Sequence, residues 1–227
     1  LESLKTNKSL QPNKNPLMPK TITLYCLLFF ASLLISAIQP KEYFTWFLEV
    51  LPAVIGFAVL AFTYKRFAFS NFTYGFILLH CVVLFIGGHY TYAEVPLFDW
   101  IRDWTGGTRN NYDKLGHFAQ GFVPALIARE IIVRKKIIPA AGWQFFFIVC
   151  FCLAFSAFYE LIEWWVALAS GQGAEAFLGT QGYIWDTQSD MALALLGAIA
   201  ALLSLSKWQD KQITNLHQIA LSPRQHP

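Results

Sequence analysis

Acidic and histidine side chains recur at helical spacing inside otherwise apolar segments, and they define the candidate site. Residues three or four positions apart lie on one face of a helix, so each group presents its side chains together. The three groups are Asp113, His117 and Gln120; Ser156, Glu160 and Glu163; and Asp186 and Asp190.

These residue types suit a divalent metal cation. Carboxylate oxygens with one or two imidazoles bind ions such as Mg²⁺, Mn²⁺ or Zn²⁺. Carboxylates and histidines on facing helices also build di-metal sites in soluble bundles, although the Glu-x-x-His pair of those sites is absent here. We therefore predict a divalent cation cofactor with the metal ligands Asp113, His117, Glu160, Glu163, Asp186 and Asp190.

Lys114 and His89 are the candidate catalytic residues. Lys114 follows Asp113 directly and is placed to meet a phosphate, while His89 ends a neighbouring apolar segment. Five carboxylates face only one lysine in this set, because the histidines are neutral at pH 7. A buried carboxylate without a partner is costly, so bound cations, protons or the positive part of a ligand must neutralise the group.

Two other interpretations of the same residues stay open. The carboxylates and histidines can carry protons or a cationic substrate across a membrane. Alternatively they form an internal polar network that fixes helix packing, with Asp113 paired to Lys114 or His117. His80, Arg129 and Glu130 lie apart from the three groups, and for them we expect local or interhelical contacts only.

The composition places all these residues in a membrane protein. The 227 residues are 56% hydrophobic and 14% charged, whereas globular chains are about 45–50% apolar and about 25% charged. The mean hydropathy is +0.43. These values exclude a disordered or collagen-like chain. The net charge of +3 is spread thinly, so we expect no nucleic-acid partner. Membrane lipid is the expected surrounding partner.

We predict an all-α polytopic fold with six transmembrane helices, since about 20 apolar residues cross the hydrocarbon. Polar tails, 1–20 and 207–227, flank one membrane domain, 21–206. Ionisable residues inside such helices indicate function by default. The predicted spans are Thr21–Ile38, Tyr43–Tyr64, Phe72–Tyr92, Lys114–Val133, Trp143–Ala169 and Thr187–Leu205.

Lysine and arginine set the orientation, because short cytoplasmic loops carry the excess of both. With both termini cytoplasmic, thirteen of the 17 Lys and Arg residues lie inside, and the polar groups all lie in the outer half of the membrane. The four outside are Lys41, Arg102, Arg109 and Lys114. An alternative is that Thr21–Ile38 is a cleaved signal peptide, which leaves the later helices oriented as before.

Two outer connections are long. Pro96 begins a short segment that alternates aromatic and charged residues, as in a helix lying in the headgroup plane. The glycine-rich segment 170–186 is either flexible or a lid over the helix ends.

Four strings resemble the YjdF-type inner membrane proteins, a bacterial multi-spanning family without an established activity. They are Gly-His-Tyr-Thr-Tyr (88–92), Tyr-Asp-Lys-Leu-Gly-His-Phe (112–118), Tyr-Glu-Leu-Ile-Glu-Trp (159–164) and Trp-Asp-Thr-Gln-Ser-Asp-Met (185–191). More distantly, Asp-Lys-x-x-His at 113–117 with the later acidic pairs is similar to the VanZ-like membrane proteins, which are associated with glycopeptide resistance. The resemblance implies a bacterial inner membrane location and supplies no reaction.

Three functions follow as hypotheses. The first is a metal-dependent step near the outer leaflet on a lipid or cell-envelope substrate, with the ion as Lewis acid. The second is a proton- or cation-coupled transporter. The third is a structural membrane protein whose polar network only holds the helices together. The oligomeric state is not determined by the sequence.

Overall fold

A computed structural model describes residues 20–170, 175–178 and 180–221, and within these residues the chain is helical without strands. This confirms the all-α prediction. Residues 1–19 of the predicted first polar tail, residues 222–227 of the second, and five residues of the segment predicted as flexible or a lid (171–174 and 179) lie outside the described residues. The helices are α1 Lys20–Ser36, α2 Tyr43–Thr63, α3 Asn71–Tyr90, α4 Pro96–Thr105, α5 Tyr112–Lys135, α6 Ala141–Ser170, α7 Glu175–Leu178 and α8 Asp186–Leu221.

Local sequence accounts for several helix ends. Ser70 is the N-cap of α3, where its side chain accepts a hydrogen bond from the backbone N–H of Thr73. Proline occupies the first position of α4, and Gly106 ends that helix with a φ of 69°. The residue that follows α5, Lys136, also has a left-handed backbone, with a φ of 53°.

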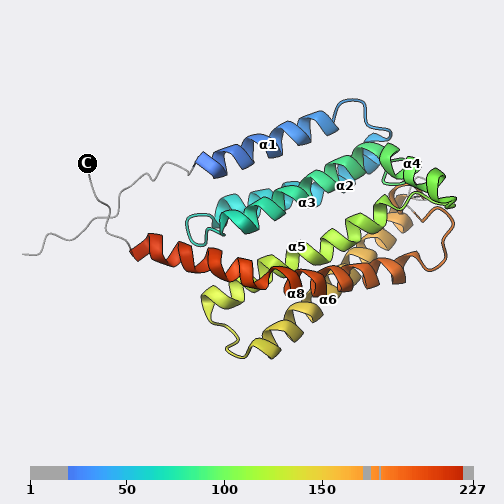
Figure 1. Cartoon of the computed structure of the whole chain (residues 1–227). Coiled ribbons are helices and arrows are strands. Elements are labelled where there is room, and N and C mark those ends of the chain that lie inside the picture. Colours follow the sequence, from blue (N-terminus) through green and yellow to red (C-terminus); the bar gives the residue numbers. More distant parts are fainter. Residues whose placement is uncertain (1–19, 171–174, 179, 222–227) are drawn as a thin grey trace, which may run out of the picture.

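The long helices form two adjoining groups (Figure 1). Helices α1 and α2 pack on α3, helices α6 and α8 pack on α5, and α3 contacts α5 between the groups. Helix α4 lies at one end of the bundle, which we call the α4 end, and the start of α1 and the end of α8 lie at the opposite end. Phe29 of α1 stacks on Phe57 of α2 at 4.7 Å between ring centroids, so α1 is part of the packed bundle.

Four helices of the described chain are long and apolar enough to cross a membrane: α2, α3, α6 and, over Asp186–Leu216, α8. The sequence predicted six spans. Helix α1 has only 17 residues, and α5 contains the polar residues His117 and Gln120 and the charged pair Arg129 and Glu130 within its length. A chain with several such helices is a membrane protein, as predicted.

Helices α5 and α8 approach so closely that only glycine fits at two positions. A Cβ atom on Gly121 would lie 1.7 Å from the carbonyl oxygen of Ala194, and one on Gly197 would lie 2.1 Å from the carbonyl oxygen of Phe118. Small residues let helix backbones meet in this way within membranes. The contact fixes the register of α5 against α8.

A fully buried carboxylate joins α5 to α3 at the opposite end. Glu130 of α5 accepts hydrogen bonds from the backbone N–H and the hydroxyl of Ser70, at 2.7 and 2.8 Å, and from the hydroxyl of Thr73 at 2.6 Å. Arg134 pairs with the same carboxylate at 2.9 Å. Glu130 therefore binds the N-terminus of α3, which is a longer-range role than the local one expected from the sequence.

Helix α8 continues to Leu221, well past its predicted end at Leu205. Gln209 of this extension is fully buried. Its amide is satisfied there, because it donates to the Leu126 carbonyl at 2.7 Å and to the Thr73 hydroxyl at 3.2 Å. Arg129 binds Gln209 and Asp210 at 3.0 and 2.7 Å. Much of the predicted polar tail is thus helical, because its polar side chains have partners on α3 and α5.

Gly121→Ala and Gly197→Ala should each destabilise the bundle, because the added Cβ collides with backbone that cannot move independently of its helix. Overpacking of this kind costs about 1–3 kcal/mol. The measurement is the thermal unfolding midpoint of purified protein in detergent. Gly56→Ala in α2 is the matched control, since a Cβ there meets nothing within 4 Å; an equal midpoint for all three variants would contradict the close approach.

Glu130→Ala should lower stability by about 3–5 kcal/mol, because it leaves the buried hydroxyls of Ser70 and Thr73 without their acceptor and removes the ion-pair partner of Arg134. Glu130→Gln should recover part of the loss. Denaturant titration of the detergent-solubilised protein measures both. Glu94→Gln breaks the exposed Lys41–Glu94 pair and should change little, so a similar loss in that variant would argue against a special role for Glu130.

Candidate metal centre

His117 of α5 lies between two carboxylates at the α4 end of the bundle. Its Nε2 is 3.3 Å from Oδ1 of Asp113, one turn earlier on α5, and 3.9 Å from Oδ2 of Asp190 on α8. One ligand atom from each of the three residues lies within 4.8 Å of the other two, and all three side chains are buried. Two oxygens and one imidazole nitrogen thus converge as a divalent cation requires.

Gln120 orients the imidazole of His117. The Oε1 atom of Gln120 lies 3.0 Å from Nδ1 of His117, so Nδ1 donates its proton to the amide oxygen. In the neutral ring the lone pair is then on Nε2, which faces Asp113 and Asp190. A second residue that fixes the tautomer of a histidine is typical of metal sites.

Several oxygens around His117 are buried without a hydrogen bond from the part of the chain that the structure describes. They are Oδ2 of Asp113, Oε1 of Glu160 and Oδ1 of Asp190. Glu160, on α6, lies with Oε1 3.7 Å from Nδ1 of His117. Buried polar atoms in folded proteins are nearly always satisfied, so these oxygens are available to accept a proton or to bind a cation.

Asp186 is paired with an arginine that the sequence analysis had assigned only to an outer loop. Arg109 donates to Oδ1 of Asp186 at 2.6 Å and lies 3.7 Å from Oδ2 of Asp113. Asp186 therefore lies at the edge of the cluster with its charge already balanced, although it was predicted as a metal ligand. A basic residue four positions before Asp113 was the available signal.

Glu163 and Glu49 extend the cluster toward α2. Glu163 of α6 is buried and interacts electrostatically with Glu160, His117 and Glu49. Glu49 of α2 is also buried, lies beside Tyr92, and was missed by the sequence analysis. It stands alone as an acidic residue in an apolar span, which was itself a signal. With Glu49, six carboxylates lie in the cluster around His117, and Arg109 pairs with two of them, Asp186 and Asp113.

The structure does not bring His89 into this cluster. Its Nδ1 lies 2.9 Å from the carbonyl oxygen of Ser36, and its ring packs against Tyr90 at 4.5 Å. The backbone N–H of Lys41 donates to the His89 carbonyl. These contacts join the ends of α1 and α3, so this candidate catalytic residue has a structural environment.

Lys114, the other candidate catalytic residue, lies at the edge of the cluster. Its ammonium is 5.3 Å from the ring centroid of Tyr183, and the guanidinium of Arg109 is 5.5 Å from the same centroid. Both cations therefore meet the connection that leads into α8.

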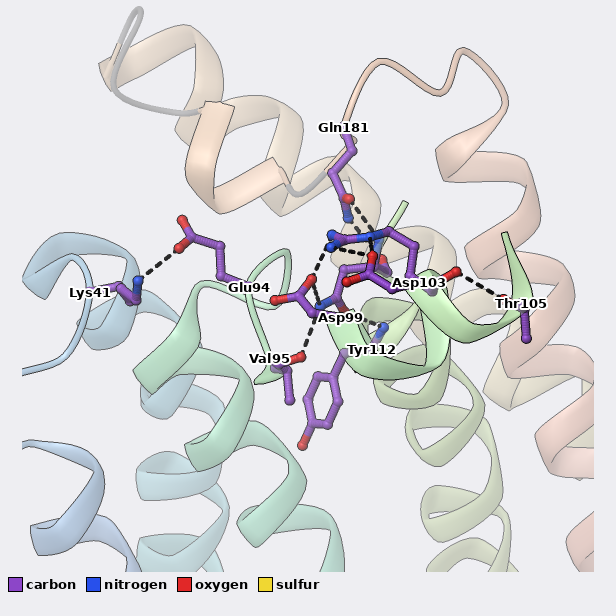
Figure 2. Close-up of polar contacts among 10 residues, drawn as sticks. Lys41, Glu94, Val95, Asp99, Asp103, Thr105, Tyr112 and Gln181 are labelled. Atoms are coloured by element: carbon purple, nitrogen blue, oxygen red, sulfur yellow. Dashed lines mark hydrogen bonds and ion pairs between the residues drawn. The ribbon is translucent and has the colours of Figure 1, made fainter. Parts of the chain in front are cut away.

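Polar contacts hold together the connections at the α4 end (Figure 2). Buried Asn110, just before α5, donates to the Val95 carbonyl at 3.0 Å and to Asp99 at 2.9 Å. Gln181 exchanges hydrogen bonds with the backbone of Asn110 at 3.0 and 2.9 Å. At the rim, the hydrogen bond with Glu94 raises the pKa of Lys41.

Comparison with known proteins gives a family and a location. The model of a family described as "Predicted membrane protein (DUF2238)" matches residues 21–211. The chain is 48% identical to the inner membrane protein YjdF of Escherichia coli (strain K12) over 181 residues, which are 80% of this chain and 87% of that protein. No solved structure matches the chain. The resemblance to the YjdF-type proteins is confirmed, and so is the inner membrane location: the chain belongs to the DUF2238 family of membrane proteins.

Proposed function

We propose that this membrane protein binds a divalent metal cation through Asp113, His117 and Asp190 and uses it on a lipid or cell-envelope substrate. The main observation in support is that three buried ligand atoms lie within 4.8 Å of one another. Glu160 supplies a further oxygen that lacks a hydrogen bond from the described residues. A bound cation supplies Lewis-acid chemistry, while Gln120 fixes the histidine and Arg109 balances Asp186.

The proposal includes six spans with both termini cytoplasmic, so that the α4 end faces outward. Helix α1 packs into the bundle through Phe29, and α5 lies between α3, α6 and α8, where polar side chains are shielded from lipid. The opposite end of the bundle carries the basic residues of α5, Arg129, Arg134 and Lys135. This is the distribution that the positive-inside rule requires.

An apolar layer argues against the transporter hypothesis. Between the cluster and Glu130 the helices α5, α6 and α8 contribute a core that includes Leu126, Ile148 and Leu202. From Gln120 to Glu130 this layer spans about 15 Å along α5. His80 of α3 faces this interior, but its Nε2 has no hydrogen-bond partner among the described residues. No chain of hydrogen-bonding side chains crosses the layer within these residues.

The purely structural hypothesis is weakened by the unpaired oxygens. A network that served only to hold helices would satisfy its own polar atoms, as Glu130 does with four partners. The carboxylates around His117 instead have three buried oxygens without a hydrogen bond from the described chain. A positive guest explains the difference.

Purified full-length protein, stripped with chelator and reloaded with Mn²⁺ or Zn²⁺, should hold the ion stoichiometrically after desalting. Asp190→Asn and His117→Ala should reduce the bound metal to background, because each removes one of the three converging ligand atoms. Elemental analysis measures the metal, and the unfolding midpoint shows that the variants are folded.

Asp103→Asn is the matched control for these variants. Asp103 is an exposed carboxylate at the same end of the bundle, paired with Arg102 and away from the cluster, so its loss should leave the metal content unchanged. Folded wild-type protein that holds no more metal than Asp190→Asn would refute the proposal.

Gln120→Leu should weaken metal affinity by roughly 10–100-fold, the usual effect of removing the partner of a ligating histidine. The volume of the side chain is nearly kept, so the fold should survive. Competition with a fluorescent chelator gives the affinity. An affinity equal to that of the wild type would show that Gln120 does not orient a metal ligand.

A further inference from the structure

We propose that the substrate of the candidate metal centre carries a phosphate group and that Lys114 is the residue that binds it. The inference rests on the proposed cation site and names the chemical class of its substrate. It starts from the position of one charged side chain, Lys114, in the first turn of α5 beside Asp113.

The charge of Lys114 is not used by the carboxylates beside it. Lys114 follows Asp113 in the first turn of α5, yet its ammonium lies 5.3 Å from the centroid of the Tyr183 ring, and within the described residues it forms no ion pair. Arg109 meets the same ring but is paired with Asp186 and Asp113. Lys114 is only half-buried. It is therefore a cation open to a ligand from outside.

The surrounding charges restrict what that ligand can be. Asp113, the residue before Lys114, is buried together with the other carboxylates of the cluster, and these groups would repel an anion as long as they are unneutralised. Once a cation is bound by Asp113 and Asp190, an anion between it and the ammonium is attracted from both sides. Phosphate has several oxygens that diverge from one centre, so it can contact the cation and the lysine together, and lysine is a common point-charge partner of phosphate.

The apolar surface next to Lys114 favours a lipid as the source of the phosphate. Ile184 and Trp185 directly follow Tyr183 and are 83% and 59% exposed, and Leu115 directly follows Lys114 and is 39% exposed. Trp164 of α6 is exposed as well, one residue from Glu163. Exposed aromatic and aliphatic side chains beside polar groups are typical of the membrane interface. A lipid can place its phosphate at Lys114 and its chains against this surface.

The test uses the full chain in a neutral detergent, reloaded with Mn²⁺ and titrated with short-chain phosphatidic acid under native mass spectrometry. Lys114→Gln should weaken lipid binding by at least about tenfold, the loss expected when one charge-assisted hydrogen bond is removed. Lys114→Arg should restore most of the binding. Lys41→Gln, which removes an exposed lysine at the same end of the bundle, should bind as the wild type does.

Four comparisons decide the chemical class of the ligand. Diacylglycerol tests whether the glyceride alone is bound, and oleate tests whether any negative charge is enough; both should bind weakly. Oleate bound as tightly as phosphatidic acid would overturn the phosphate assignment. Glycerol phosphate tests for a water-soluble phosphate ligand. If it binds as tightly as phosphatidic acid, the phosphate assignment stands and the assignment to a lipid is overturned. Metal-free wild type should bind weakly, and equal binding without metal would overturn the inference.

Metal content separates the two proposals. Lys114→Gln should keep stoichiometric Mn²⁺, because Lys114 is not among the converging ligands. If Lys114→Gln keeps its metal and binds phosphatidic acid as the wild type does, the role of Lys114 is overturned and the cation site is not. Absence of metal from folded wild type overturns the cation site on which the role depends.

Discussion

The close approach of α5 and α8 is the constraint on which the rest of the structure depends. Gly121 meets Ala194 at a distance that admits no side chain. His117 lies four residues before Gly121, and Asp190 lies four residues before Ala194, so the same register brings His117 to Asp190 one helical turn away. The glycine contact thus acts as the positioning device of the candidate metal centre. Without it the two helices would separate and the ligand atoms of α5 and α8 would diverge.

The two polar clusters of the bundle differ in a way that bears on their roles. At one end, Glu130 receives donors from Ser70, Thr73 and Arg134, and every contact is made within the chain. At the α4 end, acidic groups outnumber their donors, and oxygens of Asp190 and Glu160 have no hydrogen bond from the described residues. Both clusters are costly to bury. Only the first cluster offsets that cost through hydrogen bonds within the chain, whereas the second leaves oxygens that a proton or a cation can occupy.

The fold and the central residues of the candidate site could be predicted from the sequence, because both follow from the periodicity of residues within single helices. Helix ends lie within two residues of prediction except at the end of α8, where buried partners of Gln209 extend the helix. Spacing brought Asp113, His117, Glu160 and Asp190 to one place. It could not show that Arg109 neutralises Asp186, that Glu49 completes the group, or that His89 contacts Ser36. Those facts depend on contacts between distant segments, which periodicity within one helix does not encode.

His117 connects the alternatives for the positive guest. With Nδ1–H donated to Gln120, Nε2 either offers its lone pair to a cation or carries a second proton toward Asp113 and Asp190. The hydrogen bond to Gln120 is compatible with both states, so the orientation of the ring is kept when one guest replaces the other. Protons and a metal ion then compete for the same nitrogen and oxygens, and binding of the metal releases protons. Any cation at the proposed site is therefore bound less tightly as the pH falls.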